Sequence, residues 1–154
     1  MSEDLRKLAL NVEAIALEYI DPMKGIFQSH WIVSNIEDAD QLTKELARFL
    51  TLKAIDYDID ASIYSPSNLV DAGWHILLLS PKLYYTLSQK LLVHNIKGIH
   101  VESNILIDHD PFGGSYGRKE RYENSLNRYR ELFNEAPNGK FWKSVEETIQ
   151  GYAM

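Results

Sequence analysis

Three residues of this chain have the chemistry of an open metal site: Asp71, His75 and His109. Asp71 and His75 are four residues apart, so on a helix they share one face, about one turn from each other. Two imidazoles and a carboxylate are ligands that open Zn²⁺, Fe²⁺ or Mn²⁺ sites use, with room left for water. The alternative is structural: Asp71 hydrogen-bonds His75 or caps a neighbouring loop, and His109 tethers the turn before Pro111.

The same residues also permit chemistry without a metal. His75 is a candidate general base acting on a small polar substrate, with Asp71 fixing its tautomer. A different class of function is a non-catalytic protein-interaction module with an acidic, tyrosine-rich surface, for which Tyr116 and Trp142 are candidate partner contacts. Catalysis requires the two histidines to converge in a pocket, whereas the module does not, so the sequence leaves both functions open.

Two further motifs are incomplete. Residues 113–117 match the nucleophile elbow of hydrolases by letter, but that site needs a later histidine and none follows His109. The acidic segment 56–60 resembles the start of a calcium loop, but Ala61 and Ser67 stand where a glycine and a bidentate glutamate are required. We therefore expect a flexible turn at the first motif and a solvated acidic loop at the second.

Composition narrows the class of protein. The 154 residues, 45% of them hydrophobic, are enough for one domain, which we expect to span 1–154. The net charge of −6 without a lysine or arginine cluster argues against nucleic acid as a partner. The absence of cysteine excludes disulfides and thiolate metal sites. Because we find neither a signal peptide nor an apolar run of about 20 residues, we expect a cytoplasmic protein that does not bind membranes.

The hydrophobic pattern predicts an all-α or mostly α fold, a bundle of about five to six helices. We expect the chain to be organised around the stretch Ser65–Tyr85, with a helix over 68–79 that opens at a serine cap. On this helix Asn68, Asp71 and His75 form one narrow polar stripe, while Trp74 lies centrally on the apolar face and should be buried. The other expected helices span residues 2–19, 38–53, 81–93 and 119–134, with a short one after 140 through Val145, Ile149 and Tyr152.

Two segments are less regular. Residues 23–35 have no clear period, and the alternation of apolar residues over 98–108 permits a short β-hairpin. On the helix over 119–134 an apolar stripe should pack against the central helices, because it has to leave water; it consists of Tyr122, Leu126, Tyr129 and Phe133.

The sequence contains several blocks with a characteristic spacing. They are Arg48-Phe49-Leu50-x-Leu52-Lys53, Pro66-Ser67-x-x-Val70-Asp71-x-x-Trp74-His75, Leu79-Ser80-Pro81-x-x-Tyr84, His109-x-Pro111 and Arg121-Tyr122-x-x-Ser125-Leu126-x-x-Tyr129, followed by Phe133, Pro137 and Trp142. Together these blocks resemble the family of glycine-rich domain-containing proteins. The resemblance covers about residues 40–142 and makes 1–37 an N-terminal helical extension. This chain departs from the family in having Asp108-His109 in place of two adjacent histidines, in a longer segment over 91–107, and in lacking the glycine-rich region. The resemblance implies a domain of this family but no activity.

Overall fold

The computed structural model describes residues 2–109 and 117–144, and all regular structure in these ranges is helical. The elements are α1 (Ser2–Ile20), the 3-10 helix η1 (Asp21–Met23), α2 (Lys24–Ser29), α3 (Ile36–Ile55), α4 (Asn68–Leu78), α5 (Pro81–Leu92) and α6 (Arg118–Phe133). The prediction of an all-α bundle is confirmed. The short helix predicted near Val145 lies outside the described residues.

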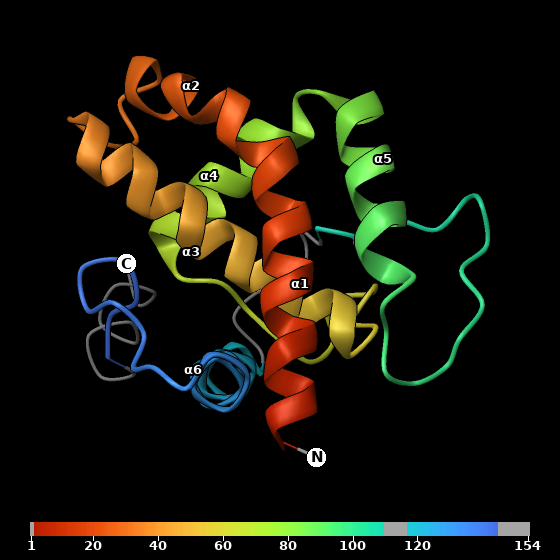
Figure 1. The fold of residues 1–154 in the computed structure, drawn as a ribbon. Helices are drawn as coiled ribbons and strands as arrows, with labels where there is room; N and C mark the ends of the chain where they lie inside the picture. Colours follow the sequence, from red (N-terminus) through yellow and green to blue (C-terminus); the bar gives the residue numbers. More distant parts are fainter. Residues whose placement is uncertain (1, 110–116, 145–154) are drawn as a thin grey trace.

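The central helix is α3, and not α4 as the sequence suggested. It packs against α1, α2, α4, α5 and α6, and every residue from Glu45 to Ile55 is buried. Figure 1 shows α1 crossing over α3, with α5 standing beside α1 and α6 seen end-on below them. The polar stripe of α4 faces outward, since Asn68 and His75 are exposed.

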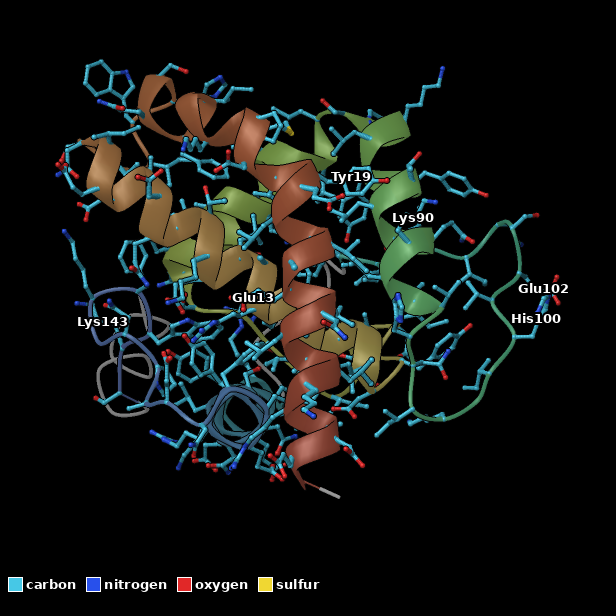
Figure 2. All side chains as sticks on the ribbon, viewed as in Figure 1. Glu13, Tyr19, Lys90, His100, Glu102 and Lys143 are labelled. Atoms are coloured by element: carbon cyan, nitrogen blue, oxygen red, sulfur yellow. The ribbon has the colours of Figure 1, made fainter. Side chains whose placement is uncertain are left out.

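The interior of the bundle contains charge, carried mainly by α3. Arg48 donates to Glu13 of α1 at 2.7 Å, to the hydroxyl of Tyr129 of α6 at 2.9 Å, and to Glu135 at 3.0 Å. Burial by itself would lower the pKa of Arg48, but the hydrogen bonds that it donates to Glu13, Glu135 and Tyr129 raise its pKa above the ordinary value. Figure 2 shows Glu13 where α1 crosses α3, so this pair joins the two helices at their crossing.

α1 is part of the main core. Its inner face buries Ala9, Val12, Ala16 and Ile20 completely, and the helix packs against α3, α5 and α6. The segment that the family resemblance placed outside, as an N-terminal extension, therefore supplies one wall of the same hydrophobic cluster.

The stripe on α6 is buried as the sequence predicted. Tyr122, Leu126, Tyr129 and Phe133 are each at most 8% exposed. Its packing partners differ from the prediction, because α6 packs mainly against α1 and α3 and not against α4 and α5.

The β-hairpin allowed for residues 98–108 does not form, since no strand occurs in this segment. The segment instead runs as a loop beyond α5 (Figure 1). Side chains of α5 form hydrogen bonds with the backbone carbonyls of this loop. Gln89 donates to the carbonyls of Glu102 and Ile105, and the hydroxyl of Tyr85 donates to the carbonyl of Ser103. These bonds replace the ladder that a partner strand would have provided.

Candidate metal centre

The helix α4 presents Asp71 and His75 on its outer face. Its N-cap is Ser67, whose hydroxyl accepts from the amide of Val70 at 3.1 Å, which fixes where the first turn begins. Gly73 permits close packing on α3, because a Cβ there would lie 3.3 Å from Leu42. With the apolar face held against α3, the side chains of Asp71 and His75 remain 34% and 55% exposed.

His109 arrives on a loop that is anchored just before it. The hydroxyl of Tyr84 donates to the carbonyl of Ile107 at 2.5 Å, and the amide of Ile107 donates to the hydroxyl of Ser88 at 3.2 Å. The amide of Asp108 donates to the carbonyl of Ile59 at 3.0 Å. Because residues 107 and 108 are tied to α5 and to the 56–64 loop, the position of the His109 backbone is set by the core.

The three predicted residues converge. His109 Nε2 lies 2.6 Å from Asp71 Oδ1, and His75 Nδ1 lies 3.9 Å from Asp71 Oδ2. The two imidazole rings are 4.5 Å apart between centroids. One ligand atom from each residue lies within 4.8 Å of the other two, which identifies this group as one that could hold a metal ion.

Aromatic side chains pack against the candidate ligand His109 and hold its loop. The ring of Trp74 meets His109 edge-on, with 4.5 Å between centroids and an angle of 67°. The indole nitrogen of Trp74 donates to Tyr84 at 2.8 Å, so the residue that packs on His109 is joined to the residue that anchors its loop. Neither Tyr84 nor Ser88 was predicted to belong to the site. The spacing of Tyr84, three residues after Pro81, shows only that it lies on α5, and its bond to Ile107 joins residues far apart in the chain.

One predicted pairing is wrong. We expected Asp71 to orient His75 as a general base, but at 3.9 Å the two are too far apart for a hydrogen bond. Asp71 instead contacts His109 at hydrogen-bond distance. The reason is geometric: His109 reaches the carboxylate from the side of the helix, whereas His75 lies one turn along it and points further into solvent.

The predicted solvated acidic loop is also wrong, because its central carboxylate is buried. Asp58 is 1% exposed and accepts from Lys53 Nζ at 2.8 Å. It accepts in addition from the backbone amides of Ser62, Ile63 and Tyr64. Burial lowers the pKa of Lys53, while Asp58 opposes that shift. The central carboxylate of the loop is therefore neutralised by a lysine of the protein.

The first carboxylate of this loop has an internal partner as well. Asp56 is 8% exposed and forms a two-pronged pair with Arg128 of α6, at 2.8 and 2.9 Å. The hydroxyl of Tyr64 also donates to Asp56. The loop over 56–64 is thus fixed by internal charge pairs, and only Asp60 of the three acids is exposed.

Of the two predicted partner contacts, Trp142 is in the core. It is 3% exposed, and its indole donates to Glu45 at 3.0 Å. The prediction of Trp142 as a contact is therefore wrong. Tyr116 lies outside the described residues, as does the motif over 113–117 apart from Gly117, the N-cap of α6.

No family model, no curated protein and no solved structure matches the chain. The resemblance to glycine-rich domain-containing proteins stays a prediction. Within the described residues, none of the helices combines the length and apolar character needed to cross a membrane.

Proposed function

We propose that this protein binds a divalent metal ion through Asp71, His75 and His109, and that the ion binds a small polar ligand at its open positions. The observation that carries the proposal is the convergence of the three ligand atoms within 4.8 Å, from residues up to 38 positions apart in the chain. Three protein ligands leave coordination positions for water and substrate, as in catalytic zinc and non-haem iron sites.

The arrangement requires a small adjustment to hold an ion. With metal–ligand bonds of about 2.0–2.2 Å, the ligand atoms of a tetrahedral site lie roughly 3.3 Å apart. The contact between Asp71 and His109 is shorter than this, and the one between Asp71 and His75 is longer. Asp71 and His75 are exposed enough to change rotamer, whereas His109 is 11% exposed and held by its loop. The first two residues therefore close on the ion, with His109 as the fixed ligand.

The position of His75 favours a metal over a purely structural cluster. A structural role is fulfilled by the contact between Asp71 and His109 alone. His75 adds a second imidazole beside that pair, yet its side chain makes no hydrogen bond to any of the described residues. Its nitrogens are therefore available as ligands.

The alternative function, an interaction module with a tyrosine-rich surface, finds less support. Of the described aromatic residues between positions 84 and 142, only Tyr85 is exposed, at 38%; the buried ones are Tyr84, Tyr122, Tyr129, Phe133, Phe141 and Trp142. The geometry thus supports the metal site better than the module.

Metal content and metal titration test the proposal. Protein without a polyhistidine tag, purified without chelator, is analysed for bound elements and then titrated with Zn²⁺, Mn²⁺ and, under anaerobic conditions, Fe²⁺ by calorimetry. We expect one ion per chain. The variants His75→Gln and Asp71→Asn should each weaken binding at least tenfold, since each removes one ligand.

A matched control is available in His100. This histidine is exposed on the outer loop, as Figure 2 shows, and is not part of the cluster. The variant His100→Gln should bind the metal as the unmodified protein does. Equal loss in His100→Gln and His75→Gln, or no binding of any of the three ions by the unmodified protein, would show that the proposal is wrong. Because His75 is half-exposed, its replacement tests the site without disturbing the fold.

A further inference from the structure

A hollow of about 170 Å³ lies beside His109. Its walls are mainly apolar, formed by Leu78, Pro81, Leu106 and the ring of Tyr84, with Asp108 and His109 as the polar residues. Leu106 and Asp108 are exposed, so the hollow can be reached from solvent.

The hollow continues the candidate metal centre. Asp71, His75 and Leu78 are spaced by four and three residues on α4, so they follow one another along a single face of the helix. Leu78 therefore stands one turn beyond His75 and forms part of the wall. On the other side, His109 belongs both to the ligand cluster and to the lining of the hollow. The apolar walls of the hollow thus lie directly beside the candidate metal ligands.

The walls of the hollow are held in place by the core. Tyr84 is 2% exposed, and its hydroxyl is bonded to both Trp74 and Ile107. Pro81 stands at the first position of α5 and has a restricted backbone. A hollow with such walls needs no rearrangement to accept a ligand.

From this continuity we infer that the ligand is amphipathic, with a metal-binding head at Asp71, His75 and His109 and a short apolar arm in the hollow. The inference rests on the proposed function and specifies its ligand class. The volume accommodates about five or six groups the size of a water molecule or methylene. The exposed carboxylate of Asp108 at the hollow disfavours an arm that ends in a negative charge.

Alkyl hydroxamates are suitable probes, because their head binds Zn²⁺ and their arm can be lengthened one carbon at a time. Affinities of acetohydroxamate and hexanohydroxamate are measured by calorimetry on the full chain loaded with Zn²⁺. Each buried methylene raises the affinity about fourfold. Hexanohydroxamate should therefore bind more than tenfold tighter than acetohydroxamate. An analogue of equal length that ends in a carboxylate should lose most of this gain. Equal affinity of acetohydroxamate and hexanohydroxamate would overturn the inference.

The variant Leu106→Ser locates the arm. Leu106 is 36% exposed, so its replacement leaves the fold intact. The substitution should reduce the gain in affinity from acetohydroxamate to hexanohydroxamate at least threefold. The affinity for Zn²⁺ should not change. The control is Leu10→Ser, at a leucine of α1 that is 52% exposed and does not line the hollow. A full gain retained in Leu106→Ser would show that the arm lies elsewhere.

Failure of the inference and failure of the proposed function have different signatures. If none of Zn²⁺, Mn²⁺ and Fe²⁺ binds, both are overturned. Binding of Zn²⁺ and of acetohydroxamate, without any gain from a longer arm, overturns the inference and leaves the metal site standing.

Discussion

The indole nitrogen of Trp74 donates a hydrogen bond to the hydroxyl of Tyr84 across 2.8 Å, and that hydroxyl donates in turn to the carbonyl of Ile107 at 2.5 Å. This chain of bonds joins α4, α5 and the loop that carries His109. The helix bearing Asp71 and His75 and the loop bearing the third candidate ligand are therefore positioned by the same buried contact.

Replacing Trp74 should destabilise the protein strongly. Trp74 is 2% exposed and packs edge-on against Phe49 at 5.4 Å. The variant Trp74→Ala removes a large buried aromatic and leaves a cavity, so we expect a loss of about 3–5 kcal/mol in the free energy of unfolding. Denaturant titration measures this loss. A loss below about 1 kcal/mol would contradict the burial of Trp74.

The hydroxyl of Tyr84 should matter for stability and for the metal site together. In Tyr84→Phe the indole of Trp74 and the carbonyl of Ile107 both lose a buried partner, which should lower the free energy of unfolding by about 1–3 kcal/mol. Zn²⁺ affinity should also fall, because the loop before His109 is released. The control is Tyr85→Phe, which removes only the exposed hydrogen bond to Ser103, and there we expect a change within about 0.5 kcal/mol. Equal effects of the two variants would show that Tyr84 has no special role.

The buried ion pair between Lys53 and Asp58 provides a third prediction. Both side chains are fully buried, 2.8 Å apart. The variant Asp58→Asn leaves the lysine charge buried without its counter-ion, and breaking a buried pair in this way costs about 3–5 kcal/mol. The neighbouring Asp60→Asn, at an exposed carboxylate, serves as the control and should cost less than about 1 kcal/mol. Thermal and denaturant unfolding of both variants measure the difference.

Stability should decline at alkaline pH. Burial is the main cause that raises the pKa of Tyr64, Tyr84 and Tyr129, and for Tyr64 and Tyr129 the carboxylates of Asp56 and Glu45 add to it. Above the ordinary tyrosine pKa of 10.0, these groups release protons in the unfolded chain while the folded protein keeps them. The unfolded state then binds fewer protons, so the free energy of unfolding falls as pH rises.

Lys53 has the opposite effect on the pH dependence of the free energy of unfolding, because burial lowers its pKa below the ordinary 10.5. Its contribution to the slope ends once the unfolded chain has lost the proton too, so the tyrosine effect is best measured between about pH 11 and 12. Each buried tyrosine should contribute a slope of up to about 1.4 kcal/mol per pH unit. Denaturant titrations of Tyr84→Phe should show a slope smaller by that amount, and an unchanged slope would contradict the prediction.

Trp31 has the opposite environment to Trp74. It is 91% exposed and holds a left-handed backbone with φ of 61°. Because a side chain disfavours this conformation and glycine does not, Trp31→Gly should raise the free energy of unfolding by up to about 1 kcal/mol. Trp31→Ala keeps the strain and should change stability by less than about 0.5 kcal/mol. A clear loss in both variants would mean that Trp31 packs against a second molecule.

The sequence by itself determined the long helices α1, α3, α4, α5 and α6 and the face of α4 that carries polar residues, but it did not indicate the short helix α2. Helical periodicity, the cap at Ser67 and the proline at position 81 act over a few residues, so they can be read locally. The spacing of Asp71 and His75 placed both on one face before any packing was known.

Tertiary structure alone decided whether His109 reaches the other two candidate ligands and which helix is central. His109 reaches Asp71 because Ile107 is bonded to Tyr84 and Ser88, and these contacts join residues about 20 positions apart. Likewise, α3 is buried although it carries Glu45, Arg48 and Lys53, because Tyr129, Glu13 and Asp58 supply their partners from other segments. A charged side chain can be buried only if its partner arrives from elsewhere in the fold, and the spacing of residues along one helix does not contain that information.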